Sequence, residues 1–539
     1  MVFARRSTTL LAAIIASCAM VLSLTACTSD NKTVVDGQTT VTSNSAGGVA
    51  VFTPSDGITL NQQMPLNKWA KLVPDLTKAL VDAGFKKGDI NHTTSDSLDK
   101  QSRAIQDFVV DHLSNNTTDD SGIAIAPDNM TLLVAPVVEA DASTRQYGDY
   151  VSQNLSTNDV TDEGATSDGE SSEDDSSKDD SSNTESDSTA SDEQAQAVDR
   201  LVSSLKLAMH VVLLGNSIEG YKPDAFVKFS DAQTIGKLQA EKMVSKLKLD
   251  KASKDNPKYI EVLLPYTAMD EKGNANDSTF AQEAFRGIWQ VLGSYYQKGV
   301  VESPSGTLDG KSTENDWQAV AYDAAKEGST AKVLDKRLAK TDGQSTLTRI
   351  DGIITMNDYI ASEVVKELDD LGYTGSAADI NPQITISGIV GNITGKKDLS
   401  RDAVPDPIKS PENDNANDSS SSDDDADKDT SASDKDRDSQ WPLVTGYGAY
   451  VSNIPSIVNG KQWMTGMEDR QTIATDIAQA CAKLNKDEAL NSMPSIRNSE
   501  VGGVKKIPTI SEPLLAVSAS NLKSALIDPG YISLADAGL

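Results

Sequence analysis

Several tryptophan, amide and charged residues have the types and positions needed to bind a neutral ligand rich in hydroxyl groups. An indole ring stacks on a face of C–H groups, while amide, carboxylate and guanidinium groups form hydrogen bonds with hydroxyls. Only 5% of the residues are aromatic, so each tryptophan beside polar residues is informative. The candidate ligand-binding residues are Asn67, Lys68, Trp69, Asn216, Arg286, Trp317, Asn357, Asp358 and Gln462.

Most of these candidates also have a structural alternative that the sequence leaves open. Trp69 and Trp317 suit stacking on a ligand, but either can instead pack in a core. Asn357 ends an apolar strand-like segment and is expected to form hydrogen bonds with a ligand, whereas Asp358 is better placed to cap the following helix. Arg286 either reaches the ligand or pairs with a nearby carboxylate.

The sequence contains no recognisable arrangement of residues for catalysis or metal binding. A Ser-His-Asp set, a phosphate-binding loop and metal-ligand spacing are all missing from it. One unpaired cysteine, Cys481, and the histidines His92, His112 and His210 supply few ligands for a zinc cluster. We therefore expect a binding protein without a cofactor or metal, rather than an enzyme such as a glycosidase.

The first residues resemble the signal segment of a bacterial lipoprotein. Arg5 and Arg6 precede an apolar run, residues 10–24, that is too short to cross a membrane as a permanent helix. The run leads to Leu24-Thr25-Ala26-Cys27, which is similar to the lipobox, whose cysteine becomes the acylated first mature residue. An ordinary signal peptide with a chance cysteine is the alternative. The resemblance implies a lipid on Cys27 that holds the protein at the outer face of the bacterial cytoplasmic membrane.

Composition and charge limit the partners and divide the chain. The formal charge of −31 disfavours nucleic acid as a partner. Residues 27–50 are polar and are expected to form a flexible tether. Residues 157–195 and 409–439 are acidic and serine-rich, with too few apolar residues to offset the entropy of ordering, so we expect two disordered insertions in loops. They are either solvated spacers or partner-binding segments.

The rest of the chain alternates strand-like with helix-like segments. A continuous apolar run such as residues 131–136 is typical of a strand buried on both faces of a parallel sheet. Residues 101–113 have the apolar spacing of an amphipathic helix, and Cys481 lies among alanines in another predicted helix. The alternation predicts α/β domains with parallel sheets. The predicted strands are residues 57–60, 131–136, 211–214, 259–264, 352–356 and 443–446.

Short motifs follow one another in a fixed order along most of the chain after residue 59. They are Asn67-Lys68-Trp69, Gln101 with Ile105-Gln106, Ala225 to Asp231, Asn274 to Asp277 with Arg286-Gly287, Asp316-Trp317, Asp351 to Asp358, Val444 to Gly446, and Asn459 to Thr465. No single motif is specific, but their order and spacing together resemble the type I periplasmic sugar-binding proteins. The xylose-binding and multiple-sugar-binding branch is the most similar one.

This resemblance implies two doubly wound parallel-sheet lobes joined by a hinge, with the ligand beyond the carboxyl ends of the strands. The chain also departs from the family at charged positions. Lys68 replaces an arginine, Asn216 stands where the family has an Asp-Arg pair, and an acid is missing beside Gly448. A further strand-like segment, residues 384–388, competes for the position of that last strand. The departures predict altered or weakened binding of a simple monosaccharide.

The resemblance also divides the chain into functional parts. They are a signal peptide (1–26), a tether (27–50), a first lobe (51–225), a second lobe (226–440), and hinge crossovers with closing segments (441–539).

The function implied is that of a monomeric sugar-binding lipoprotein, the substrate-binding component of an ABC importer, which closes on a mono- or small oligosaccharide and delivers it to a membrane permease. The alternative is a degenerate surface lipoprotein that uses the same fold as a sensor or adhesion scaffold.

Overall fold

The computed structural model describes much of the chain beyond residue 45. The predicted signal peptide with Cys27, the second acidic insertion and the predicted strands at 57–60 and 384–388 lie outside the described residues. The described residues are 46–55, 65–114, 129–138, 146–150, 153–156, 184–269, 276–324, 326, 328–339, 347–377 and 441–539.

The first lobe is built on a sheet of seven strands in the order β15-β16-β7-β5-β3-β1-β2. Neighbouring strands run parallel, except that β15 and β16 form an antiparallel pair at one edge. The chain runs from β1 to β2 on one side and then to β3 on the other, so the winding reverses between β1 and β3. The strands are β1 Gly48–Pro54, β2 Ile90–Ser95, β3 Met130–Val134, β5 His210–Leu214, β7 Ala225–Val227, β15 Ile496–Val501 and β16 Val504–Ile510.

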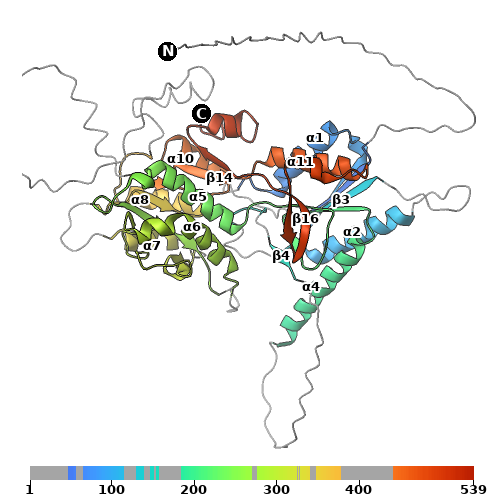
Figure 1. The fold of residues 1–539 in the computed structure, drawn as a ribbon, viewed down its shortest axis with the longest axis horizontal. Coiled ribbons are helices and arrows are strands. Elements are labelled where there is room, and N and C mark those ends of the chain that lie inside the picture. Colours follow the sequence, from blue (N-terminus) through green and yellow to red (C-terminus); the bar gives the residue numbers. More distant parts are fainter. Residues whose placement is uncertain are drawn as a thin grey trace, which may run out of the picture. The chain divides into compact units, whose positions relative to one another are not determined.

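Helices cover both faces of this sheet (Figure 1). The apolar core with α1 and α11 includes Val49 and Val51 of β1, whereas the core with α2 and α4 includes Ala50 and Phe52. This alternation follows from the pleat, because successive side chains of a strand point to opposite faces. Both faces are therefore buried, and strands such as β3 read as continuous apolar runs. The helices are α1 Trp69–Asp82, α2 Leu98–Ser114, α4 Thr184–Leu205 and α11 Arg470–Leu484.

The second lobe has a sheet of four parallel strands in the order β10-β8-β12-β13. Its helices share one continuous apolar core with the sheet. Helices α5 and α6 approach closely, since a Cβ atom on Gly287 would lie 2.0 Å from the carbonyl oxygen of Gln233. The elements are β8 Lys258–Val262, β10 Val301–Glu302, β12 Gly352–Ile354, β13 Leu443–Val444, α5 Ala232–Leu247, α6 Thr279–Gln297, α7 Ser329–Arg337 and α8 Asp358–Asp370.

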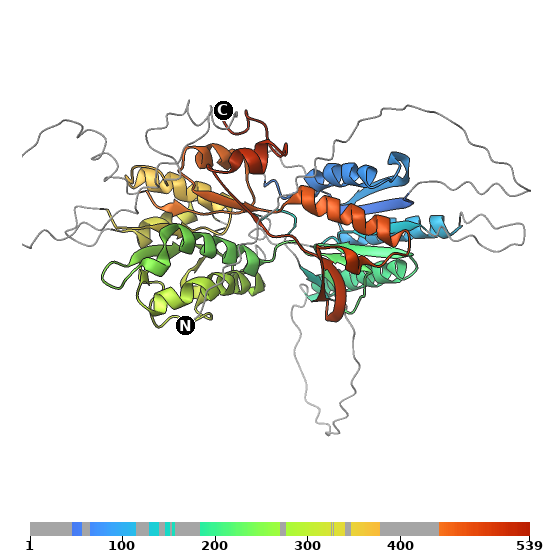
Figure 2. The same cartoon turned by 45° about the horizontal axis from the view of Figure 1, so that its top comes forward.

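Within the described residues the chain passes between the two sheets three times (Figure 2). It leaves the first sheet after β7, returns after β14 and leaves again after β16. β17 then pairs antiparallel with β14, which joins the second and third passages. The remaining short elements are β4 Asn154–Leu155, β6 Ser217–Ile218, β9 Leu264–Pro265, β11 Ala321–Tyr322, α10 Ile454–Val458, β14 Met464–Met467 and β17 Leu515–Ser518.

The α/β class with parallel sheets, predicted from the sequence, is confirmed. Five of the six predicted strands correspond to β3, β5, β8, β12 and β13, and the helix predicted at 101–113 is α2. Cys481 is buried in α11 as expected.

Two predicted segments differ in the structure. The first strand begins at Gly48, so the end of the predicted tether belongs to the sheet. Helix α4 begins at Thr184, within the acidic tract that was predicted to be disordered over 157–195, whose earlier part lies outside the described residues. The second half of α4 buries Val198 and Leu201, and a helix once anchored extends at little further cost.

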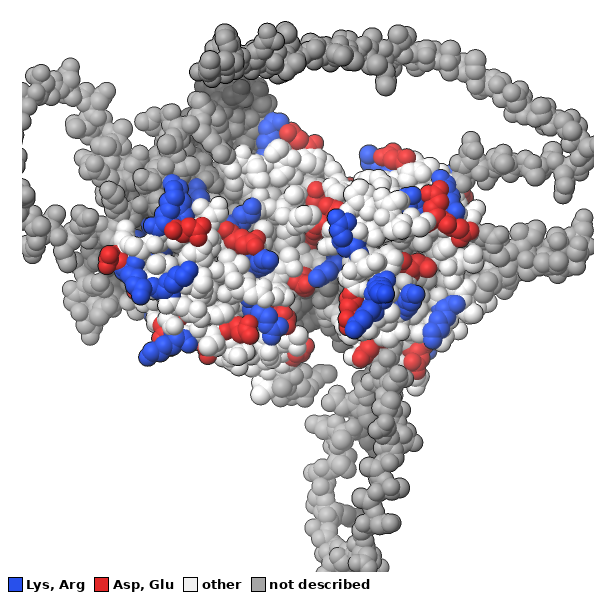
Figure 3. Space-filling view, in the orientation of Figure 1, with Lys and Arg blue, Asp and Glu red and all other residues white. Residues whose placement is uncertain are grey.

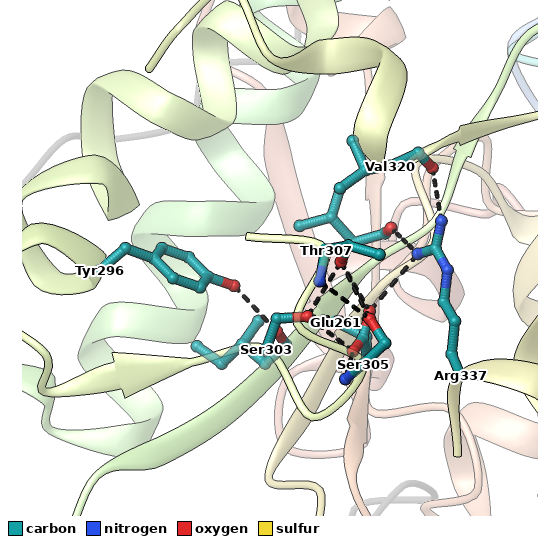
Figure 4. A network of polar contacts seen from close by, with 9 residues as sticks. Glu261, Tyr296, Ser303, Ser305, Thr307, Val320 and Arg337 are labelled. Atoms are coloured by element: carbon teal, nitrogen blue, oxygen red, sulfur yellow. Dashed lines mark hydrogen bonds and ion pairs between the residues drawn. The ribbon is translucent and has the colours of Figure 1, made fainter. Parts of the chain in front are cut away.

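A buried polar network lies inside the second lobe (Figure 4). Glu261 on β8 accepts hydrogen bonds from the Ser303 hydroxyl at 2.7 Å and from the backbone N–H of Ser305 at 2.8 Å. Arg337 of α7 approaches the second carboxylate oxygen at 3.4 Å and also donates to the carbonyl oxygen of Val320 at 2.9 Å. The carboxylate is fully buried and its partners are all supplied by the protein, so this network stabilises the lobe.

Charged side chains of both signs are interspersed on the face of the molecule seen in Figure 3. Exposed pairs such as Lys78 with Asp82 and Lys100 with Asp96 are separated by one helical turn. Among the described helices, none is both long and apolar enough to cross a membrane.

Candidate functional site

The topology of each sheet indicates where a ligand would bind. In open α/β sheets, ligands bind beyond the carboxyl ends of the strands, at the point where the winding order reverses. That point lies between β1 and β3 in the first sheet and between β8 and β12 in the second. Asn67, Lys68 and Trp69 precede or begin the helix that follows β1, and Asn357 follows β12. The sequence therefore placed these candidates at both reversal points.

Trp69 lies at the first residue of α1 and is buried, with 2% of its surface exposed. Its ring contacts the rings of Tyr150 and Phe229 edge-on, with centroid distances of 5.0 and 5.7 Å. No side chain at the helix N-cap accepts its backbone N–H. Instead Asp149 does so from far along the chain, with its Oδ2 at 3.0 Å. A carboxylate at a helix N-terminus is favourable because it faces unpaired N–H groups.

Asn67 and Lys68 contact the same segment as Trp69. The Nζ atom of Lys68 lies 2.9 Å from Oδ1 of Asp149, and the Tyr150 hydroxyl donates to the carbonyl oxygen of Lys68. The carbonyl oxygen of Asn67 accepts the backbone N–H of Asp149 at 2.8 Å. The Nδ2 atom of Asn67 is buried without a hydrogen-bond partner among the described residues. A buried amide donor in this condition is costly and is a candidate ligand contact.

Asn357 is fully buried directly after β12 and makes two different hydrogen bonds. Its Oδ1 accepts the backbone N–H of Ile360 at 2.9 Å, and its Nδ2 donates to Oε1 of Gln146 at 3.2 Å. Asn357 is therefore the residue that caps α8, and the prediction that Asp358 does so is wrong. The preceding residue, Met356, has a φ of 67°, which is unfavourable for a side chain of this size and is often found beside functional residues.

Asp358 and Gln462 form a buried pair. Asp358 accepts from Nε2 of Gln462 at 2.7 Å, from the Thr465 hydroxyl at 2.8 Å and from the backbone N–H of Tyr450 at 2.9 Å. Burial raises the pKa of the Asp358 carboxyl to about 6, although these donors oppose the shift. The Oε1 atom of Gln462 is occupied by Asn453 at 2.8 Å. These groups join α8 to the segments that lead toward β14.

Three other candidates contact other groups of the protein. Asn216 makes two hydrogen bonds to residues distant in sequence, accepting the backbone N–H of Gln153 at 3.0 Å and donating to the carbonyl oxygen of Pro136 at 2.9 Å. Trp317 is 8% exposed and meets the ring of Tyr266 edge-on at 5.1 Å.

Arg286 pairs with Glu283 one turn earlier on α6. The contacts of Trp317 and Arg286 suit the structural alternatives that the sequence left open, and the roles of all three residues toward a ligand stay predictions.

One segment between β3 and α4, Gln146–Tyr150, contacts both groups of candidates and was not identified from the sequence. Gln146 binds Asn357 through its side chain, and its carbonyl oxygen accepts the Tyr450 hydroxyl at 2.6 Å. Tyr147 packs on Phe280 of α6, with ring centroids 4.7 Å apart. The segment could have been identified from its composition, because two tyrosines, an amide and an acid within five residues are typical of sugar binding.

Gly148 explains how this segment approaches the first lobe so closely. Its φ of 96° is accessible mainly to glycine, and a Cβ atom there would lie 2.6 Å from the carbonyl oxygen of Asn67. The segment is therefore fitted to the loop before α1.

A second missed residue, Glu468, lies where the chain returns to the first lobe. It is 1% exposed and accepts the backbone N–H of Ser230 at 2.7 Å, the Ser230 hydroxyl and the Tyr447 hydroxyl at 3.3 Å. Burial raises the pKa of its carboxyl to about 7. Nothing in the sequence separates this glutamate from the many other acidic residues of the chain. Among the described residues, no group of three or more His, Cys, Asp or Glu side chains is arranged to hold a metal ion.

The sequence matches no protein-family model, and no curated protein shows significant similarity to it. Solved structures are similar to the chain over most of its length. An ABC transporter solute-binding protein from Clostridium phytofermentans with bound β-D-glucose has 16% identity and a TM-score of 0.45, covering 91% of this chain and 99% of its own.

A carbohydrate transporter solute-binding protein from Chloroflexus aurantiacus, in complex with D-glucose, has 17% identity and a TM-score of 0.43, covering 92% and 98%. A periplasmic solute-binding protein from Actinobacillus succinogenes with bound D-allose has 10% identity and a TM-score of 0.38, covering 89% and 99%.

Proposed function

We propose that this chain is an extracytoplasmic sugar-binding lipoprotein, the substrate-binding component of an ABC importer. One observation carries the proposal. Residues after β1 of the first sheet and after β12 of the second both contact the five-residue segment Gln146–Tyr150. The candidates of the two lobes therefore face a common place, at the winding reversals where open α/β sheets bind ligands.

The residue types at this place favour a neutral, hydroxylated ligand. Asn67 and Asn357 contribute amides, and Trp69 contributes an aromatic ring. Such a set binds hydroxyls by hydrogen bonds and C–H faces by ring contact. A mono- or small oligosaccharide of the kind bound by the xylose and multiple-sugar branch fits this chemistry. Asn216, Arg286 and Trp317 remain proposed contacts of the ligand.

Capture requires no bond to be made or broken. Three chain passages join the lobes, and hinge closure around a ligand would present a surface of each lobe to a membrane permease. A lipid on Cys27 would hold a monomer at the outer face of the cytoplasmic membrane, followed by a tether that ends before β1 and by two lobes joined at a hinge.

A second function, a non-transport sensor or adhesion scaffold, is favoured by a specific observation. Asp149 already pairs with Lys68, and Gln146 already binds Asn357, so the protein satisfies groups that a transported ligand would use.

Isothermal titration of the full chain with pentoses, hexoses and short oligosaccharides tests the main proposal. Saturable binding of at least one sugar is expected, with a dissociation constant at or below the micromolar range, about −8 kcal/mol. The absence of binding to every sugar would contradict the transport proposal and favour the scaffold.

A further inference from the structure

The segment Gln146–Tyr150 contacts the two lobes in the way that a bound ligand would. On the first lobe, Asp149 accepts the backbone N–H of Trp69 at 3.0 Å and pairs with Lys68 at 2.9 Å. On the second lobe, Gln146 accepts Nδ2 of Asn357 at 3.2 Å. Two of these contacts use side chains predicted to bind ligand, Lys68 and Asn357, and the third uses the backbone N–H of Trp69. All three come from one short stretch of chain.

Aromatic contacts divide between the lobes in the same manner. Tyr150 stacks on Phe229, with centroids 4.8 Å apart, and belongs to the core of the first lobe. Tyr147, three residues earlier, is 1% exposed and belongs to the core of the second lobe. The segment therefore attaches to both lobes through burial as well as through hydrogen bonds.

We infer that the side chains of Gln146 and Asp149 are an internal stand-in for the ligand, which occupy ligand-binding groups of both lobes until a sugar displaces them. This inference rests on the proposed sugar-binding function. A protein whose binding-competent state is a fraction of the population has an apparent affinity reduced by that fraction. The segment thus sets the sugar concentration at which the lobes respond.

The polar contacts made by the side chains of Gln146 and Asp149 are weak enough for reversible displacement. The Lys68–Asp149 pair is partly exposed, with 19% and 20% of the two side chains accessible, so solvent weakens it. The Gln146–Asn357 bond joins two neutral amides, which is worth less than a bond to a charged group. A sugar with several hydroxyls can replace both contacts.

The test compares the full-length chain with Gln146→Ala, Asp149→Ala and the double variant. Each is titrated calorimetrically with the panel of pentoses, hexoses and short oligosaccharides. We expect the double variant to bind its sugar about tenfold more tightly than the unmodified chain, because two competing contacts are lost. Unchanged or weaker binding would overturn the inference, since the segment would then be neutral or part of the binding site itself.

Matched controls remove the same groups elsewhere. Asp82→Ala breaks an exposed pair with Lys78, and Gln282→Ala removes an amide bonded to Ser278 on α6. Both should leave sugar affinity unchanged. Gln146→Ala alone guards against a folding defect in the double variant, because it removes a contact between lobes and leaves the cap of α1 intact.

A second readout needs no sugar and separates this inference from the sugar-binding proposal. The backbone N–H groups of Ser230 and Gly448 form hydrogen bonds in the connecting segments and touch neither altered side chain. If no sugar binds either chain, the sugar-binding proposal is refuted. Faster amide exchange at these two sites in the double variant would then still show that the two side chains bridge the lobes. Unchanged exchange at both sites overturns the inference.

Discussion

The carboxylate of Glu468 accepts the backbone N–H of Ser230 at 2.7 Å, although 238 residues separate them. Ser230 lies in the first passage between the sheets, and Glu468 lies in the second. This hydrogen bond therefore ties two connections of the hinge. Glu468 is buried beside hydroxyl and amide donors and forms no ion pair among the described residues, so we expect its protonation state to affect stability.

Stability should decrease as the pH rises from about 5 to 7. The pKa of Glu468 is raised to about 7 in the folded protein, above the ordinary value of 4.5, so the folded state binds the proton more tightly. The cost of ionising the buried group is absent below the ordinary pKa and complete above pH 7. A shift of this size corresponds to about 3 kcal/mol. Chemical denaturation at several pH values measures it.

Replacing Glu468 by glutamine should reduce this dependence and leave the smaller part due to Asp358, whose pKa is raised to about 6, since an amide oxygen still accepts from Ser230. The variant should exceed the unmodified chain in stability at pH 8 and match it near pH 4.5. Glu302→Gln, at an exposed position, serves as the control and should follow the unmodified chain. Parallel pH profiles for Glu468→Gln and the unmodified protein would refute the assignment.

Replacing Arg337 by methionine should destabilise the second lobe by about 3 kcal/mol, because a buried Glu261 loses its cation. The two side chains are 8% and 0% exposed, so water cannot substitute for the missing partner. Thermal unfolding measures the loss. Lys78→Met breaks an exposed pair and should change stability by less than about 0.5 kcal/mol. Equal effects of the two substitutions would contradict the importance of burial.

Replacing Gly287 by alanine should destabilise the packing of α5 on α6 by about 1–3 kcal/mol, because the added Cβ would overlap the backbone of Gln233. Alanine is otherwise the better helix former, so a gain in stability would show that the helices separate without cost. The matched control is Gly88→Ala, where no atom lies within 4 Å of the new Cβ. Denaturant unfolding of both variants gives the comparison.

Replacing Asn357 by aspartate should weaken sugar binding about tenfold or more while preserving the fold. Aspartate still caps α8 by accepting the N–H of Ile360, but it cannot donate a hydrogen bond as Nδ2 does. Calorimetric titration measures the affinity, and the melting temperature reports on the cap. Asn498→Asp, on an exposed strand position, should change neither. Undiminished affinity in Asn357→Asp would remove this residue from the proposed site.

Local pattern was sufficient to predict much of the fold. Continuous apolar runs such as residues 131–136 predicted buried parallel strands, because both faces of such a sheet are covered by helices. Helix α2 followed from apolar spacing in the same way. The helix at the end of the first acidic tract could not be predicted in this way, since its formation depends on packing of the apolar residues that follow it.

The sequence by itself determined the α/β class and placed Trp69 at the start of a helix and Asn357 near the end of a strand, because both depend on local order along the chain. Only the tertiary structure decided that Gln146–Tyr150 connects them, and that Glu468 joins two hinge passages. Gln146 and Asn357 are 211 positions apart, and Ser230 and Glu468 are 238 positions apart. The winding of two sheets brings each pair together, and no local pattern encodes that winding. The physical reason is that local periodicity fixes which face of an element is buried, whereas long-range packing fixes what that face meets.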